Sequence, residues 1–173
     1  MSLPSEPRSW TRDGFHISTD KRLLSTEAIN AAFEQDFVYW TQRHPPHILQ
    51  AIIEKSCCFG LYQSVDPSIA TDQETNLRQI GFARLVTDHF TFAYLNDLYV
   101  LPEYQGLGLG GWLIDCVDEV VRPLPYLRWF MLRTCVQKSK ESYQKRISMD
   151  VLVSDPHKTG PVIMGRKGNF NTG

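Results

Sequence analysis

The residues with the clearest chemical potential are the glycines of one short segment: Gly106, Gly108, Gly110 and Gly111. An apolar stretch expected to form a strand precedes them, and an amphipathic stretch expected to form a helix follows. The first N–H groups of a helix have no internal partners and carry the positive end of the helix dipole. Because glycine lets the backbone curl closely around an anion, the segment is suited to bind a phosphate group.

Known phosphate-binding loops differ in what must accompany the glycines. A P-loop needs Lys and then Ser or Thr after its last glycine, whereas Trp112 and Leu113 follow Gly111 here. Gly106, Gly108 and Gly111 have the G-x-G-x-x-G spacing of a dinucleotide fold, which also requires an acidic residue about 20 positions later. No such residue stands at that distance, and the antiparallel strands expected before the motif also argue against that fold.

The segment resembles the signature of the GNAT superfamily of N-acetyltransferases, which is a strand, then V-x-P-x-x-[Q/R]-x-x-G-x-[G/A], then a helix. Its fixed positions are all present, as Val100, Pro102, Gln105, Gly108 and Gly110. The resemblance covers about residues 15–150, because the predicted order of elements is also that of the family. The motif is specific for the pyrophosphate of coenzyme A and much less specific for an acceptor.

The resemblance implies acetyl-CoA as the cosubstrate and no metal. Main-chain N–H groups of the glycine segment would hold the pyrophosphate, and the pantetheine arm would lie between the strand ending at Val100 and the parallel strand 128–134. A backbone N–H near Val100 would face the thioester oxygen and stabilise its developing negative charge. The expected cofactor-binding residues are Leu98, Tyr99, Val100, Gln105, Gly106, Leu107, Gly108, Leu109, Gly110 and Gly111.

Two side chains are candidates for proton transfer. A lysine-like amine has a pKa of about 10.4, so its deprotonation at neutral pH needs a base or a water relay. Asp97 is the first candidate for the base, with structural pairing of its carboxylate as the alternative; Asp88 and His89 are weaker candidates. Tyr143 stands where many family members have a tyrosine that protonates the leaving thiolate, although the Gly-Phe pair that usually follows is absent.

Acceptor contacts are expected from the two N-terminal helices and from a hairpin. The candidates are Tyr39, Trp40, Arg43, Arg84 and Tyr94. An arginine can form a forked pair with a substrate carboxylate. Since no acidic cluster is evident, we expect a small amine that carries an acid or aromatic group rather than a polycation. A core position for Trp40 and a surface position for Arg43 are the alternatives.

The apolar pattern predicts the elements that must position these residues. Residues 1–14 are expected to form an arm, and residues 15–173 a single domain. Strands are predicted at 15–18, 57–62, 77–87, 91–101 and 128–134, with closing strands at 149–154 and 161–166. Because 77–87 and 91–101 are joined so briefly, they are expected to form an antiparallel hairpin.

Helices are predicted between these strands. The first begins near Ser25 or Thr26 and carries Ile29, Ala32, Phe33, Phe37 and Trp40 on one face. The others follow Pro45-Pro46, open at Gly106–Gly111 and span residues 138–146. The expected fold is α/β (α+β): a GNAT-like mixed, mostly antiparallel sheet of six to seven strands with about four helices, in which a splayed strand pair forms the cofactor cleft.

The composition limits the partners. The 173 residues fit one domain, and 42% apolar with 21% charged residues is typical of globular chains. A formal net charge of −1 argues against a nucleic-acid or anionic-membrane partner. No apolar run approaches the roughly 20 residues of a membrane span, and no secretory signal is recognisable, so a cytoplasmic location is expected, with the nucleus as the alternative.

The cysteines and histidines do not suggest a metal site. The cysteines are Cys57, Cys58, Cys116 and Cys135, none with C-x-x-C spacing and each in an apolar stretch, so they are expected to be buried and reduced. His44 and His47 flank two prolines without an acidic or cysteine partner.

Two functions follow from these observations. The first is an acetyl-CoA-dependent N-acyltransferase that moves an acetyl group directly to a primary amine, of a small molecule or alternatively of a protein. The second is a coenzyme A-binding module of GNAT type that regulates or scaffolds without transferase activity. Either could be a monomer or a homodimer.

Overall fold

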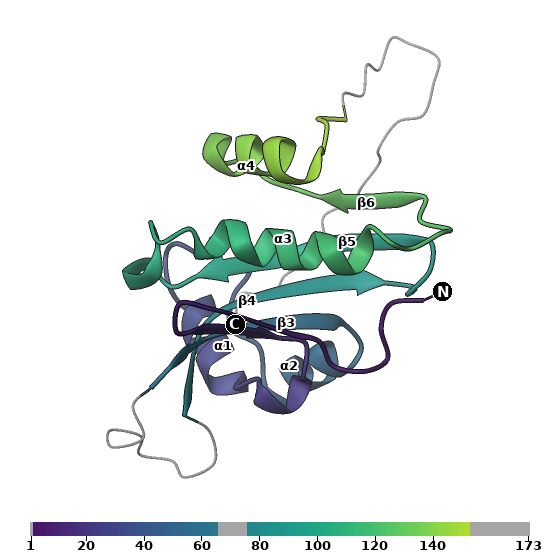
Figure 1. The fold of residues 1–173 in the computed structure, drawn as a ribbon. Coiled ribbons are helices and arrows are strands. Elements are labelled where there is room, and N and C mark those ends of the chain that lie inside the picture. The colour runs from purple at the N-terminus through teal and green to yellow at the C-terminus, as the bar shows by residue number, and fades with distance from the viewer. Residues whose placement is uncertain (1, 66–75, 153–173) are drawn as a thin grey trace.

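The computed structural model describes residues 2–65 and 76–152, and a mixed β-sheet forms its centre (Figure 1). Within these residues the sheet has six strands in the order β1-β2-β3-β4-β5-β6. The strands are β1 (Ser9–Arg12), β2 (Phe15–Ser18), β3 (Cys57–Ser64), β4 (Leu77–Thr87), β5 (Phe92–Val100) and β6 (Trp129–Leu132). Neighbouring strands are antiparallel except β5 and β6, which are parallel.

Helices cover both faces of this sheet (Figure 1). The α-helices are α1 (Thr26–Phe33), α2 (Pro46–Glu54), α3 (Leu109–Val121) and α4 (Gln137–Ile147), and short 3-10 helices span Lys21–Leu23 (η1) and Pro102–Tyr104 (η2). Helix α3 lies across one face and contacts α4, whereas α1 and α2 lie on the other face. The prediction of a mixed, mostly antiparallel sheet with about four helices is confirmed.

Each face of the sheet has its own apolar core. The α3 core includes Leu61, Ala83, Leu95, Leu113 and Val117, all buried. The α1–α2 core is smaller and includes Ile29, Phe33, Leu49, Phe82 and Tyr99. A strand residue therefore belongs to one core or the other according to the face its side chain takes, as the two-residue period of a strand requires.

Strand β5 breaks this period with a bulge. Arg84 of β4 pairs with Asp97, but the next residue, Leu85, pairs with Leu95, so Asn96 is an extra residue on β5. A β-bulge shifts the alternation of side chains by one position and bends the strand.

The bulge decides which side chains reach which face. Leu95 lies in the α3 core, and Leu98 and Val100 pack with the same core. Tyr99 lies in the α1–α2 core, and the side chain of Asp97, two residues earlier on the strand, points to the same face of the sheet. Without the extra residue, Asp97 and Tyr99 would face α3 together with Leu95.

Helix α1 is shorter than predicted. Ser25 caps it, because its hydroxyl accepts the N–H of Ala28 at 3.1 Å, but the helix ends at Phe33. The side chain of Asn30 bonds both the N–H and the carbonyl of His44, at 3.0 and 2.9 Å, and so holds the 34–45 segment folded back along the helix. The prediction that Phe37 and Trp40 continue the apolar face of this helix was therefore wrong.

Other differences from the predicted elements lie at the two edges of the sheet. Ser9–Arg12, predicted to belong to an arm, pair with β2 as strand β1, where Trp10 stacks on Phe59 with the ring centroids 6.2 Å apart. Strand β6 is shorter than the predicted strand at 128–134, and its residues are only half-buried or exposed. Residues 149–152 are not in a strand, and the rest of the two predicted closing strands lies outside the described residues.

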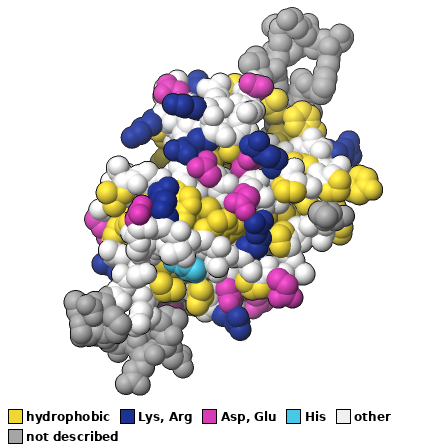
Figure 2. Space-filling model, viewed as in Figure 1, with side chains coloured by type: hydrophobic (Ala, Val, Ile, Leu, Met, Phe, Trp, Pro, Cys, Tyr) yellow, Lys and Arg dark blue, Asp and Glu magenta, His cyan; other side chains and the backbone are white. Residues whose placement is uncertain are grey.

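The surface that carries α3 and α4 mixes basic and acidic side chains without a large patch of either sign (Figure 2). None of the helices in the described part of the chain combines the length and the apolarity that a membrane span requires.

Asp88 closes the predicted β4–β5 hairpin. Its carboxylate accepts the Thr91 hydroxyl at 2.6 Å and the N–H groups of Phe90, Thr91 and Phe92 at 2.8–3.0 Å. These bonds hold the pKa of Asp88 well below its usual range.

A carboxylate whose pKa is depressed by folding stabilises the protein above its unfolded pKa, and that stabilisation is lost as the pH falls toward the folded pKa. Asp88→Asn is therefore expected to lower Tm at neutral pH, by an amount that shrinks as the pH falls below about 4. Thermal unfolding from neutral to strongly acidic pH measures this, with the exposed Asp36→Asn as the matched control. A constant difference in Tm across the whole range would contradict the assignment.

Candidate functional site

The glycine loop, residues 105–111, joins η2 to α3. Gly106 and Gly108 have φ angles of 86° and 75°, in the left-handed region that favours glycine, and Gly108 is the N-cap of α3. Two left-handed residues within three positions let the chain make a tight curl before the helix begins.

This curl leaves a run of main-chain donors unpaired. None of the N–H groups from Gly106 to Gly111 has an acceptor among residues 2–65 and 76–152; the first bonded one is that of Trp112, which donates to the carbonyl of Gly108 at 3.0 Å. They surround the positive end of the dipole of α3. The arrangement therefore fits a phosphate group, as the sequence predicted.

The loop is held firmly to the sheet. The Gln105 side chain donates to the carbonyl of Val100 at 3.0 Å, and the N–H of Leu101 donates to the carbonyl of Ile80 at 2.9 Å. Gln105, predicted to bind the cofactor, thus fixes the loop to the end of β5 with its side chain.

Two guanidinium groups that the sequence analysis did not select lie beside the loop. That of Arg12 stacks over the ring of Trp112 at 4.6 Å, close to Gly108. That of Arg146, paired with Asp115 at 2.7 Å, covers Gly111 so closely that any side chain there would collide with it. They come from β1 and α4, and no local pattern places these elements beside the loop.

Strands β5 and β6 separate where the bulge lies. Their pairing runs from Phe92 with Trp129 to Leu95 with Leu132 and ends there. Residues 96–100 of β5 have no strand beside them on that side in the described part of the chain. We call this opening, between residues 96–100 and the chain that follows Leu132, the wedge. It is the splayed pair that the sequence predicted, and its edge can bond an extended ligand as an additional strand would.

A cavity of about 800 Å³ lies between β6, α3 and α4, and it is lined by Tyr94, Leu132, Thr134 and Tyr143 among others. Only 9% of the surface of Tyr143 is exposed, and burial raises the pKa of its hydroxyl to about 12. This hydroxyl has no hydrogen-bond partner within the described residues. Tyr94 and Tyr143, predicted for different roles, thus line one cavity.

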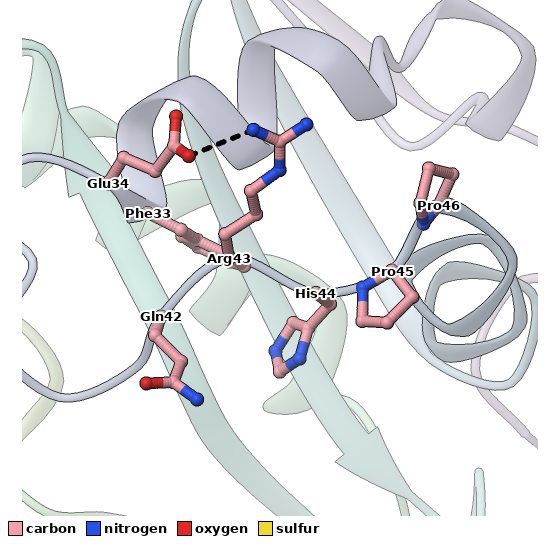
Figure 3. Close-up of a pocket in the computed structure, with 7 residues that line it drawn as sticks. All are labelled: Phe33, Glu34, Gln42, Arg43, His44, Pro45 and Pro46. Atoms are coloured by element: carbon pink, nitrogen blue, oxygen red, sulfur yellow. Dashed lines mark hydrogen bonds and ion pairs between the residues drawn. The ribbon is translucent and has the colours of Figure 1, made fainter. Parts of the chain in front are cut away.

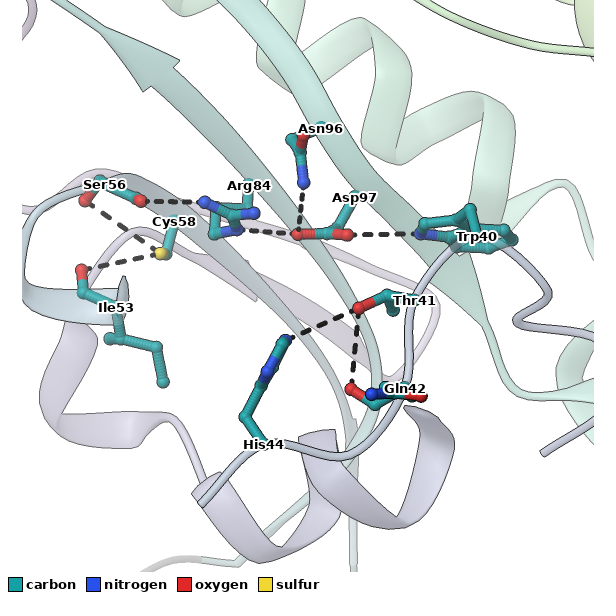
Figure 4. A network of polar contacts seen from close by, with 10 residues as sticks. All are labelled: Trp40, Thr41, Gln42, His44, Ile53, Ser56, Cys58, Arg84, Asn96 and Asp97. Atoms are coloured by element: carbon teal, nitrogen blue, oxygen red, sulfur yellow. Dashed lines mark hydrogen bonds and ion pairs between the residues drawn. The ribbon is translucent and has the colours of Figure 1, made fainter. Parts of the chain in front are cut away.

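Asp97 lies at the centre of a polar network on the α1–α2 face (Figure 4). Its carboxylate is 3% exposed and accepts Arg84 Nε at 2.6 Å, Trp40 Nε1 at 3.1 Å and Asn96 Nδ2 at 3.3 Å. Arg84 also donates to the Ser56 hydroxyl at 3.2 Å. The structural pairing considered as the alternative for Asp97 is therefore present, and the guanidinium of Arg84 is occupied by a protein carboxylate.

Arg43 lies elsewhere, in an open hollow of about 600 Å³ beside α1 (Figure 3). Its guanidinium pairs with Glu34 at 3.0 Å, and both side chains are at least half exposed. The structure thus brings Trp40, Arg84 and Asp97 together, but it leaves Arg43 outside this group.

The cysteines are all free, but they are not all buried as predicted. Cys58 and Cys116 are buried, and burial raises the pKa of each thiol to about 12. Cys135 is exposed and lies 2.8 Å from the hydroxyl of Tyr39. No group of three or more metal-ligating side chains occurs in residues 2–65 and 76–152.

Comparisons with known proteins agree with this geometry. Residues 69–146 match the acetyltransferase (GNAT) domain family. A Gibberella zeae protein described as an acetyltransferase is 39% identical over 137 residues, which cover 75% of this chain and 77% of the relative.

Solved structures extend the likeness to the fold. A Xanthomonas campestris protein described as a GNAT-family acetyltransferase is 32% identical, with a TM-score of 0.60 over 83% of this chain and 96% of that one. The Arabidopsis thaliana NAA60, solved with a bisubstrate analogue, is 17% identical, with a TM-score of 0.54 over 74% of this chain and 79% of that one. The second likeness concerns the fold alone.

The buried pair of Arg84 and Asp97 generates a stability prediction. Arg84→Met is expected to lower the free energy of unfolding by about 3–5 kcal/mol, because it leaves a buried carboxylate without its cation. Arg43→Met, which removes an exposed pair, is the matched control and is expected to cost at most about 1 kcal/mol. Urea unfolding of both variants measures the difference. Equal losses would show that the Arg84–Asp97 pair is not the stabilising one.

Proposed function

Because the chain belongs to the GNAT acetyltransferases, we propose that it transfers an acetyl group from acetyl-CoA directly to the primary amine of a small molecule. The observation that carries this proposal is the run of N–H groups from Gly106 to Gly111 that have no acceptor among the described residues, located beside the edge of β5 that β6 leaves open. Phosphate binding and thioester placement then require the main chain of one continuous segment, from Leu98 to Gly111.

The chain's own groups suit the pyrophosphate and the pantetheine arm of acetyl-CoA. The glycine loop would hold the pyrophosphate through its N–H groups, with Gln105 keeping the loop in place. Leu98 and Val100 would bond the pantetheine arm through their main chain, which leaves their side chains in the α3 core. Main-chain donors fixed by a sheet need no reorganisation when charge develops on a nearby oxygen, and this favours acyl transfer.

The proposed reaction forms one bond and breaks one. The acceptor nitrogen bonds to the acetyl carbon, the carbon–sulfur bond of the thioester breaks, and the coenzyme A thiolate leaves. The nitrogen loses a proton and the thiolate gains one, so the transfer is balanced without an oxidant or a metal.

Tyr143 is the proposed donor of the thiolate's proton. With its pKa raised to about 12 by burial, its hydroxyl remains protonated at neutral pH and is available to a thiolate. Its lack of a partner among the described residues leaves the proton free to be donated. These two properties support the role that the resemblance suggested.

The contacts of Asp97 decide whether it can be the general base that takes the proton from the acceptor amine. Asp97 was the candidate from the sequence, but its carboxylate already accepts bonds from Arg84, Trp40 and Asn96. The geometry therefore favours a positioning role for Asp97, with the amine proton passing to water.

The proposal that the glycine loop binds the pyrophosphate predicts the effect of replacing Gly108. Gly108→Ala is expected to weaken coenzyme A binding about tenfold or more, because a side chain at this left-handed φ displaces N–H groups that bond a charged ligand. Gly14→Ala introduces the same strain in the β1–β2 turn, where φ is 79°, and serves as the control. Both variants are expected to lose about 1–2 kcal/mol of stability. Calorimetric titration with coenzyme A that shows equal affinities would contradict the loop assignment.

A second prediction concerns Tyr143. Tyr143→Phe is expected to lower kcat about 100-fold without changing coenzyme A affinity, because only the proton donor is removed. Thiol release from acetyl-CoA with a panel of primary amines measures kcat, and the exposed Tyr126→Phe is the control. Unchanged kcat would exclude the role, whereas wild-type protein that binds coenzyme A but acetylates no amine would favour the non-catalytic module.

A further inference from the structure

Two neighbouring aromatic residues connect the two sides of the wedge. Trp40 is bonded to Asp97 on β5, and Tyr39 is bonded to Cys135 in the chain that follows β6. We call Tyr39 and Trp40 the aromatic bridge. Because both residues belong to the 34–45 segment, this segment spans the opening between β5 and β6.

The β5 end of the bridge is anchored by buried charge. Asp97 is turned toward Trp40 by the bulge at Asn96, and Arg84 forms an ion pair with it at 2.6 Å (Figure 4). A carboxylate accepts a stronger hydrogen bond than a neutral group does, so the indole N–H is held in one place. Asp97 thus holds the β5 end of the bridge through Trp40.

The other end is anchored by a weaker contact. The Tyr39 hydroxyl lies 2.8 Å from Cys135 Sγ, and this hydrogen bond raises the pKa of Tyr39 above its ordinary value. The hydroxyl therefore stays protonated and can donate to the sulfur. Neither anchoring hydrogen bond uses a ring face.

Both rings keep part of their aromatic surface exposed. They meet edge to face, with their centroids 5.3 Å apart and an interplanar angle of 87°. Tyr39 is 59% exposed and Trp40 is 37% exposed. The carboxylate bonded to Trp40 is paired with Arg84, so this surface offers apolar and π contacts rather than a free negative charge.

We propose that the aromatic bridge is the acceptor-selecting wall of the wedge, positioned by Asp97 and Cys135, and that it favours a primary amine that carries an aromatic ring. The inference rests on the proposed function, because it concerns the same transfer site. An aromatic acceptor can pack against either ring while its amine reaches into the wedge. An aliphatic amine of similar size gains the same burial but not the ring contact.

The test compares phenethylamine with n-hexylamine as acceptors. In Tyr39→Leu and Trp40→Leu, the ratio of kcat/KM for phenethylamine to that for n-hexylamine is expected to fall about three- to tenfold, which is the loss of one aromatic contact. The change is expected mainly in KM. Trp40→Phe keeps a ring without the indole N–H and is expected to retain part of the ratio.

Asp97→Asn separates positioning from catalysis by a base. It is expected to raise KM for phenethylamine while the pH profile of kcat keeps its shape. Loss of the acidic limb of that profile would assign Asp97 as the base and overturn its positioning role. The exposed Tyr126→Leu, near the opposite end of β6, is the control for removal of an aromatic side chain, and thermal unfolding identifies any variant that fails to fold.

A readout that does not need turnover distinguishes the two proposals. Phenethylamine binding in the presence of coenzyme A, measured by ligand-observed NMR, is expected for the wild type and is expected to be weakened in both leucine variants. This result supports the bridge even if no acetyl transfer occurs. Acetyl transfer with an unchanged acceptor ratio in folded variants overturns the bridge and leaves the transferase standing. Wild-type protein that neither binds nor acetylates phenethylamine also overturns it.

Discussion

The bulge at Asn96 is the constraint on which the candidate site depends. It lies where β5 stops pairing with β6. At this point the alternation of side chains between the two faces of the sheet shifts by one residue, and the strand no longer has β6 beside it. Leu98 and Val100 then point into the α3 core while the main chain beside them has a free edge. A regular strand would pair along its length and would leave no edge for a ligand.

The same bulge brings a charged pair into the opposite core. Asp97 and Arg84 are both largely buried, which costs desolvation of each charge. That cost is offset by the hydrogen bonds that Arg84, Trp40 and Asn96 donate to the carboxylate. The pair therefore connects the sheet to the 34–45 segment, which has no regular secondary structure of its own to fix its path.

The glycine loop and the aromatic bridge differ in whether main-chain groups or side chains would contact a ligand. Around the glycine loop the proposed binding groups belong to the main chain, and the side chain of Gln105 secures the loop by donating to the carbonyl of Val100. At the bridge the functional surfaces are side chains, those of Tyr39 and Trp40. Main-chain donors tolerate changes of sequence that keep the curl, whereas a side-chain wall changes with each substitution. Under the proposed function, donor binding would be the general property of this site and acceptor choice the individual one.

The sequence by itself determined those features of the fold that depend on residues close together in the chain. The glycine loop, the β4–β5 hairpin and helix α3 all follow from local spacing, since turns, caps and amphipathic faces are formed within a few positions. The bulge at Asn96 was not predicted, although the adjacent polar residues Asn96 and Asp97 inside an apolar strand are a local sign of it. Only the tertiary structure decided the early end of α1, the partner of Trp40, and the positions of Arg12 and Arg146. These depend on contacts between residues far apart in the chain, for which local periodicity carries no information.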